Sequence, residues 1–232
     1  MKLSKRMQAI VDLIAPCDVV ADVGCDHGKV AVYLLQNKKA KFVYISDISA
    51  PSLQKAKNTL IENSFNNFKA IVSDGFKEYD VTDLQSINTI VIAGMGGQEI
   101  VEILIELFKC NIDLQKKFKL VLQPQNNEVL LRKFLIKQKC AIDTDRILQE
   151  DAKFYNIVSC ETNTKSKLKT KEIYLGKTNL KEVSSDFINW LEHKIKVLEK
   201  AKAASRGKFE FKKELKMFQK AYKKLAKTII KC

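Results

Sequence analysis

Three aspartates occupy equivalent places in the first third of the chain: Asp22, Asp47 and Asp74. Each lies at or beside the end of a short apolar run typical of a buried strand, namely Val19–Gly24, Phe42–Asp47 and Ala70–Ser73. Taken singly, each aspartate is more typical of a turn or a helix cap than of a ligand site. Acids at successive strand ends, however, can hold an ammonium group, ribose hydroxyls and an adenine amino group. The ordered set of three therefore predicts a nucleoside-binding site.

The first of these loops has two glycines and two acids. Gly24 allows a tight turn out of the strand, and Gly28 allows close approach of the following helix or of a ligand. A pyrophosphate needs free backbone N–H groups, and the negative charges of Asp22 and Asp26 would repel it. A cofactor with a sulfonium and an ammonium group and no phosphate fits better. We therefore predict S-adenosylmethionine, with Asp22 at its aminoacyl end.

Two later segments end strand-like runs with residues that suit a ligand. Gly94, Gly96 and Gly97 surround Met95 and leave the backbone bare, although they equally suit a tight turn before a helix. Met95 can lie against a flat base or simply pack. The segment Gln123–Asn127 offers amides that can bind the edge of a base or cap the next helix.

These segments need a fold that brings strand ends together. Strand patterns over Val19–Gly24, Phe42–Asp47, Ala70–Ser73, Thr89–Ala93 and Lys119–Leu122 alternate with helical patterns, such as His27–Gln36 and the helix that Ser49 and Pro51 open. This alternation predicts an α/β fold with a doubly wound parallel sheet, in which ligands bind at the carboxyl ends of the strands. Cys140–Gln149 and Phe154–Cys160 read as an antiparallel pair at the sheet edge.

The C-terminal third has a different pattern. Residues 164–178 are rich in Thr, Ser and Lys and read as a linker between a domain at 1–163 and a helical segment at 179–232. In that segment, apolar residues recur at spacings of three and four, which predicts an antiparallel coiled-coil hairpin with its turn at Ala203–Gly207. The seam residues are Ile188, Leu191, Ile195, Leu198, Phe211, Leu215, Phe218, Tyr222, Leu225 and Ile229.

The basic charge is concentrated in the same third. Residues 164–232 carry 20 Lys or Arg against 7 Asp or Glu, out of 41 against 27 in the whole chain. Two interpretations remain open: a basic surface that binds a polyanion, and lysines that only solubilise the helices. No apolar run is long enough to cross a membrane, and no secretory signal is recognisable. The six scattered cysteines form no zinc or disulfide pattern. We expect a cytoplasmic protein without a metal, with a monomer favoured.

Four motifs together resemble one family, the bacterial TrmK family: Ala21-Asp22-Val23-Gly24-Cys25-Asp26-His27, Ala93-Gly94-Met95-Gly96-Gly97, Leu122-Gln123-Pro124 and Glu150-Asp151-Ala152-Lys153-Phe154-Tyr155. The start Leu3-Ser4-Lys5-Arg6 is also similar. The combination is specific, whereas any single piece is weak. The chain departs from the family at Gln125, where Asn is usual, and at Asp47, where Glu is usual. The first change leaves the role of Gln125 open, and the second shortens the reach of a carboxylate.

The resemblance implies a Rossmann-like class I methyltransferase that methylates N1 of adenosine 22 in tRNA, with S-adenosylmethionine as cofactor. Because the methylated base is cationic, Asp26 is expected to stabilise developing charge. His27 either touches the substrate, orients Asp26 or merely packs. The expected catalytic residues are Asp26, His27 and Met95. The expected cofactor-binding residues are Asp22, Gly24, Gly28, Asp47, Ile48, Asp74, Gly75, Ala93, Gly94, Met95 and Gly96. The expected substrate-binding residues are Lys5, Arg6, Gln123, Pro124, Gln125 and Tyr155, with no metal site.

Two other functions are weighed against this one. A non-catalytic RNA-binding protein with a degenerate nucleotide fold is disfavoured by the intact series of acids. An NAD-dependent oxidoreductase is disfavoured by the missing G-x-G-x-x-G motif and by the acids around the first loop.

Overall fold

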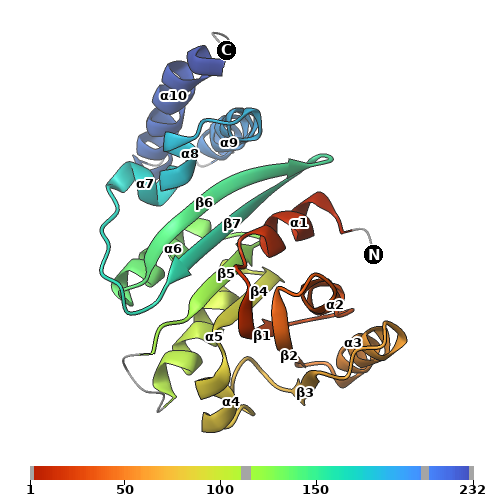
Figure 1. Cartoon of the computed structure of the whole chain (residues 1–232). Coiled ribbons are helices and arrows are strands. Elements are labelled where there is room, and N and C mark those ends of the chain that lie inside the picture. Colours follow the sequence, from red (N-terminus) through yellow and green to blue (C-terminus); the bar gives the residue numbers. More distant parts are fainter. Residues whose placement is uncertain (1–2, 111–115, 205–208, 230–232) are drawn as a thin grey trace. The chain divides into compact units, whose positions relative to one another are not determined.

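The computed structural model describes residues 3–110, 116–204 and 209–229, and in the last range the side chains of 212–227 only. It divides into two compact units, which are described separately: unit 1 comprises residues 1–144 and 156–167, and unit 2 comprises 145–155 and 168–232. The elements of both units are labelled in Figure 1. Within the described ranges, no helix combines the length and the hydrophobicity needed to cross a bilayer.

A mixed sheet of seven strands in the order β3-β2-β1-β4-β5-β7-β6 contains the strands that the sequence predicts. The first five strands pair in parallel, and β7 pairs antiparallel with β5. The predicted α/β class and the edge position of the last two strands are thus confirmed. The strands are β1 (Cys17–Val23), β2 (Ala40–Asp47), β3 (Phe68–Val72), β4 (Thr89–Met95), β5 (Lys119–Pro124), β6 (Ala141–Glu150) and β7 (Lys153–Glu161).

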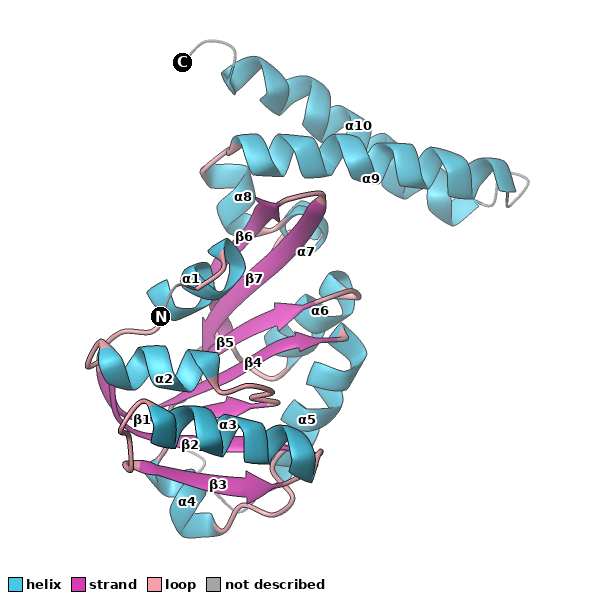
Figure 2. Cartoon of the chain, turned by 90° about the vertical axis from the view of Figure 1, so that its right-hand side faces the viewer, coloured by secondary structure: helices cyan, strands magenta, loops and turns pink. Residues whose placement is uncertain are grey.

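Helices cover both faces of the parallel part of the sheet, which makes it doubly wound. Figure 2 shows α2 and α3 on one face and α5 and α6 on the other. Central strand residues such as Val20, Ile45 and Ile92 are completely buried between these layers. The helices of unit 1 are α1 (Lys5–Asp12), α2 (Lys29–Gln36), α3 (Ala50–Glu62), α4 (Val81–Ser86), α5 (Gly97–Lys109) and α6 (Glu128–Lys137).

The starts of two helices are fixed by local chemistry. Ser49 caps α3 by accepting a hydrogen bond from the Ser52 N–H, and Pro51 lies in its first turn, as predicted. The helix predicted from His27 begins instead at Lys29, because Gly28 adopts a left-handed conformation with φ of 67°. The Cβ position of Gly28 would lie 3.1 Å from Ala56 of α3. Gly28 therefore serves close packing of two helices.

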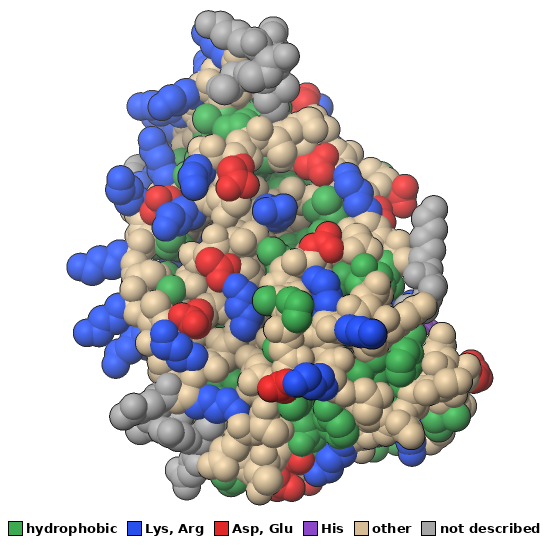
Figure 3. All heavy atoms as spheres, in the orientation of Figure 1, with side chains coloured by type: hydrophobic (Ala, Val, Ile, Leu, Met, Phe, Trp, Pro, Cys, Tyr) green, Lys and Arg blue, Asp and Glu red, His purple; other side chains and the backbone are tan. Residues whose placement is uncertain are grey.

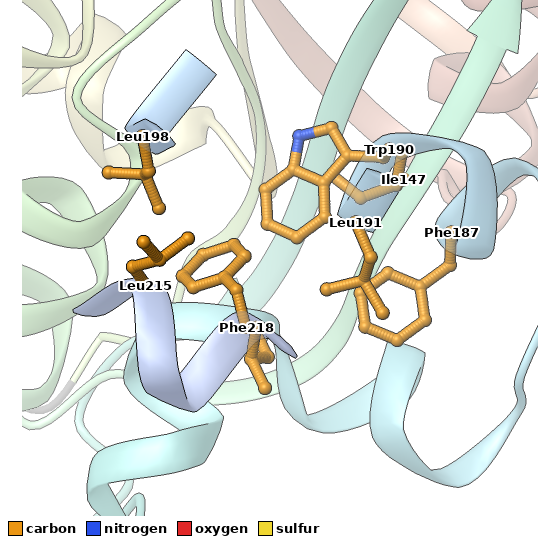
Figure 4. Close-up of a cluster of buried hydrophobic side chains, with 8 residues drawn as sticks. Ile147, Phe187, Trp190, Leu191, Leu198, Leu215 and Phe218 are labelled. Atoms are coloured by element: carbon orange, nitrogen blue, oxygen red, sulfur yellow. The ribbon is translucent and has the colours of Figure 1, made fainter. Parts of the chain in front are cut away.

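Unit 2 contains residues 145–155, which form the end of β6, the turn and the start of β7. Its helices are α7 (Thr170–Leu175), α8 (Lys177–Lys181), α9 (Ser185–Ala204) and α10 (Phe209–Ile229). Its core joins Ile147 of β6 to both long helices (Figure 4). Trp190 lies 5.5 Å from Phe218, between ring centroids. The other buried members are Leu175, Phe187, Leu191, Leu198 and Leu215.

The predicted helical seams pack as expected, since the described seam residues all belong to this cluster. The side chains of Phe211 and Ile229 and most of the turn predicted at Ala203–Gly207 lie outside the described residues. The stretch 164–178, predicted as a linker, contains α7 and the start of α8. The structural division also differs from the predicted boundary at 163, because the tip of β6 and β7 packs with the helices. The predicted domain boundaries stay a prediction.

The backbone of β6, the edge strand, is covered within unit 2 by side chains from the helical segment. The N–H groups of Asp145, Ile147 and Gln149 donate to Thr178 Oγ1, Asn179 Oδ1 and Asp186 Oδ2 at 2.8–2.9 Å. Asn179 is itself buried, and its Nδ2 donates to the Leu175 carbonyl at 2.9 Å. These bonds satisfy donors that an edge strand would otherwise expose.

Candidate active site

A cleft of about 460 Å³ opens in unit 1 at the carboxyl ends of β1 to β4. All three aspartates of the series line it, as do Asp26 and Glu99. The described lining residues are Arg6, Met7, Ile10, Asp22, Val23, Gly24, Cys25, Asp26, His27, Lys29, Val30, Asp47, Ile48, Ser73, Asp74, Gly75, Ala93, Gly94, Met95, Glu99, Ile103 and Gln125. The sheet therefore brings Asp22 and Asp74, which are 52 positions apart in sequence, to one cleft, as the strand-end pattern predicts.

Asp22 is the most unusual group in the cleft. Its side chain is buried, and its Oδ2 is the one buried side-chain oxygen or nitrogen without a hydrogen-bond partner among the described residues. The pKa of the Asp22 carboxyl is raised from 3.8 to about 7, chiefly by burial; a backbone hydrogen bond from Ala31 opposes the shift, and the negative charge of Asp47 adds to it. A buried carboxylate without its full set of partners is costly. A ligand with an ammonium group would satisfy it.

The side chain of Asp47 accepts hydrogen bonds from two backbone N–H groups beside the cleft. Its Oδ2 accepts from the Asp26 N–H at 3.2 Å, and its Oδ1 accepts from the Ser49 N–H at 2.9 Å. Each carboxylate oxygen has two lone pairs, so both can still accept a bond from a ribose hydroxyl. The neighbouring Ile48 exposes 71% of its surface and offers an apolar wall.

Asp74 is oriented by a lysine. Lys77 Nζ lies 2.5 Å from Asp74 Oδ2, and both side chains are about half exposed. Before Asp74, the buried Ser73 donates from Oγ to the Gly75 carbonyl at 2.9 Å and accepts from the Glu78 N–H. These bonds fix the left-handed turn at Gly75, where φ is 63°.

The loops after β1, β4 and β5 fit tightly together. A Cβ at Gly24 would lie 2.0 Å from Met95 Cε, so Met95 covers the first loop only because position 24 is glycine. A Cβ at Gly97 would lie 2.5 Å from the Asn126 carbonyl oxygen. The Gln125 N–H donates to the Met95 carbonyl at 2.8 Å. Gln125 consequently lies against Met95 at the side of the cleft.

Asp26 and His27 project from the first loop. Asp26 has a left-handed backbone with φ of 47°, and its side chain is 72% exposed. His27 Nε2 lies 3.8 Å from Asp26 Oδ1. This contact fits the idea that His27 orients Asp26, which remains a prediction. The exposure of Asp26 leaves its carboxylate accessible to an incoming base.

Several predicted residues lie elsewhere. Gln123 is completely buried, and Pro124, Gly28, Gly96 and Lys5 are not among the cleft-lining residues. Gly96 is instead the N-cap of α5, where its N–H donates to Glu99. Tyr155 belongs to unit 2, and its role stays a prediction.

Sequence reasoning missed most of the wall that α1 contributes. Met7 and Ile10 line the cleft beside Arg6, and Glu99 and Lys29 line it from α5 and α2. The spacing of Arg6 and Ile10, four residues apart on one helical face, was the available signal. No group of three His, Cys, Asp or Glu residues suitable for a metal occurs within the described ranges.

Comparison with known proteins identifies the family. Residues 3–158 match the family model described as "Methyltransferase domain". The tRNA (adenine(22)-N(1))-methyltransferase of Bacillus subtilis is 33% identical over 162 residues, which cover 69% of this chain and 66% of that protein. A relative in Mycoplasma pneumoniae is 33% identical over 173 residues, 73% of this chain and 77% of that protein. The chain belongs to the TrmK family of methyltransferases.

The TrmK-family likeness extends to the three-dimensional structure. The crystal structure of the B. subtilis m1A22 tRNA methyltransferase TrmK matches with a TM-score of 0.79 at 25% identity, covering 98% of this chain and 99% of that one. Streptococcus pneumoniae Sp1610 in complex with S-adenosyl-L-methionine matches with a TM-score of 0.83 at 25% identity, covering 95% and 100%. The predicted TrmK family and Rossmann-like fold are confirmed.

Proposed function

We propose that this protein transfers a methyl group from S-adenosylmethionine to N1 of adenosine 22 in tRNA. The observation that carries the proposal is the unsatisfied buried oxygen of Asp22, at one end of a cleft that also holds Asp47 and Asp74. These three carboxylates suit a cationic nucleoside and would repel the pyrophosphate of a dinucleotide. The named activity of the B. subtilis relative and the cofactor bound to Sp1610 support the same reaction.

The residues of the cleft divide the work of binding. When bound, S-adenosylmethionine supplies an electrophilic methyl group on its sulfonium. Asp22 would hold the ammonium group, Asp47 the ribose hydroxyls and Asp74 the adenine amino group, beside the wall formed by Ile48. Gly24 and Gly94 keep side chains away from the ligand, and Met95 lies between the first loop and Gln125.

Catalysis needs placement more than proton transfer. N1 of adenine has an in-plane lone pair, so it can attack without a strong base once it is held in line. N1 lies on the Watson–Crick edge, so the base has to leave its pair and stack. Asp26, exposed beside the cleft, can stabilise the positive charge that develops on the base.

Lysines of unit 2 are proposed to bind the tRNA backbone. Figure 3 shows Lys and Arg side chains gathered around α7 and α10. Lys213, Lys216, Lys220 and Lys224 recur at helical spacing on α10, and all four are exposed. The proposal includes a cytoplasmic, monomeric protein that needs no metal.

The reaction is tested by incubating the full chain with unmodified tRNA and labelled S-adenosylmethionine, followed by mass mapping of the tRNA. One methyl group on adenosine 22 is expected, and a tRNA with guanosine at position 22 is the control. Calorimetry should show binding of S-adenosylmethionine but not of NAD. Binding of the cofactor without transfer would favour the RNA-binding alternative, and binding of NAD would exclude the proposal.

A further inference from the structure

Arg6, predicted only as a substrate-binding residue, lies within the cofactor cleft itself. It lines the cleft from α1, and its Nη1 lies 3.6 Å from the position that a Cβ at Gly94 would occupy. Gly94 itself has a φ of 84°, which favours glycine. The guanidinium therefore lies over bare backbone at the end of β4, close to Met95 and Gln125.

A buried amide holds Arg6 there. Arg6 Nη1 donates to Gln123 Oε1 at 2.8 Å, and Gln123 Nε2 donates to the Pro124 carbonyl at 3.0 Å. The second bond fixes which end of the amide faces Arg6. Because Gln123 is completely buried, it cannot contact the substrate directly as predicted. It acts instead on the orientation of the arginine.

The amide partner of Arg6 is neutral, so this bond fixes the position of the guanidinium and does not itself neutralise its charge. The guanidinium carries its N–H donors in a planar fork. Such a fork matches the two oxygens of a carboxylate or phosphate.

The helix that carries Arg6 is itself anchored. Lys39 Nζ donates to the carbonyl of Val11, in the last turn of α1, at 2.6 Å and to that of Ile14, just after the helix, at 2.8 Å. Ser4 caps the other end by accepting from the Met7 N–H. Arg6 is thus presented to the cleft from a helix fixed at both ends.

We propose that Arg6, aimed by Gln123, is the oxyanion-binding residue of this cleft. The inference rests on the proposed function, which offers two sources of such an oxyanion: the carboxylate of the cofactor's methionine moiety and a phosphate of the target nucleotide. With Asp22 at the ammonium group, Arg6 at the carboxylate would complete recognition of a zwitterion.

Calorimetry on the full chain tests the first source. R6Q is expected to weaken S-adenosylhomocysteine about 10- to 100-fold. It should leave binding of the decarboxylated analogue, which keeps the ammonium group, unchanged. The measured quantity is the ratio of the affinity for S-adenosylhomocysteine to the affinity for the decarboxylated analogue. Q123L should lower this ratio as R6Q does, but by less. R6K keeps the charge without the planar fork and should fall between wild type and R6Q.

Binding of unmodified tRNA as a function of salt tests the second source. Loss of one phosphate contact lowers the slope of log K against log salt by about 0.7 to 0.9. If R6Q changes only the calorimetric ratio, Arg6 binds the carboxylate of the cofactor. If R6Q changes only the salt slope, Arg6 binds a phosphate of the tRNA.

K55Q is the control, since Lys55 is exposed on α3 and is not among the described cleft-lining residues. It should alter neither the ratio nor the slope. The inference is overturned if R6Q and R6K behave as wild type in both arms, or if K55Q reproduces R6Q. Thermal unfolding without ligand checks that each variant folds. Failure of the wild-type chain to bind S-adenosylhomocysteine would instead overturn the proposed function.

Discussion

At the scale of single residues, the buried carboxyl of Asp22 carries a cost in stability when it is ionised. Its pKa is raised from 3.8 to about 7 by burial, so the folded protein keeps a proton that the unfolded chain loses. Stability should consequently fall as the pH rises through this window and level off above it. The cost appears because Oδ2 has no partner among the described residues.

D22N removes this charge and keeps the shape of the side chain. Without ligand, the free energy of unfolding of D22N should exceed that of wild type by up to about 4 kcal/mol at pH 8 and by little at pH 4. Denaturant titrations at several pH values measure the difference. D151N removes a charge from an exposed turn, and its free energy of unfolding should depend on pH in the same way as that of wild type. Cofactor binding by D22N should be at least about tenfold weaker, since a charge-assisted bond is lost.

Asp26 should separate catalysis from cofactor binding. D26N suits this test better than D26A, because asparagine tolerates the left-handed φ of 47°. We expect transfer to fall by about 10- to 100-fold as the developing charge loses its carboxylate. The cofactor affinity measured by calorimetry should stay within a factor of two or so, because the Asp26 contact to Asp47 is made by its backbone N–H. Full activity in D26N would remove Asp26 from the mechanism.

The strand-end acids could be found from sequence because their positions follow from the alternation of strands and helices. Arg6 could not be placed in this way. Its location depends on how α1 packs beside β5 and on the buried Gln123, which are contacts between positions 117 residues apart. Gln123 looked like a substrate residue because its amide chemistry suits a base, and only its burial shows otherwise.

At the scale of elements, the backbones of α5 and of the loop after β5 approach each other closely. Gly97, the first residue of α5, lies against the backbone of Asn126, whereas a Cβ at Gly96 would meet only the end of the Asn126 side chain at 3.4 Å. The Asn126 carbonyl cannot move aside without displacing the loop between β5 and α6.

G97A should therefore destabilise the protein by about 1–3 kcal/mol through overpacking. G96A is the matched control and should cost well under half of that. Denaturant unfolding at fixed pH measures both. Equal effects of the two substitutions would show that the close approach at Gly97 is not strained by a methyl group.

The elements of the C-terminal third were only partly predictable. The seams of α9 and α10 could be located because apolar spacing alone reveals them. The helix α7 was missed because its lysines and threonines resemble a linker, and its Leu175 is buried by contacts from distant elements. Local composition cannot report such tertiary burial.

At the scale of the whole molecule, the proposed binding of RNA by unit 2 rests on charge. Replacing Lys216, Lys220 and Lys224 by Gln should lower the salt slope of tRNA binding by about 2 to 3 if all three contact phosphates. Cofactor affinity should not change. The same number of exposed lysines replaced in unit 1, at Lys38, Lys41 and Lys55, forms the control. Filter binding at several salt concentrations measures both triple variants, and equal slopes would favour lysines that only solubilise the helices.

Charge substitution is preferable to deletion of the helical segment for a reason that lies in β6. Thr178, Asn179 and Asp186 supply the acceptors for the outward N–H groups of this edge strand. A chain shortened before residue 178 would present a row of unpaired donors together with the uncovered Ile147, which is a template for strand addition. The helical segment therefore also covers the edge of the sheet, and its removal is expected to promote self-association of the shortened chain.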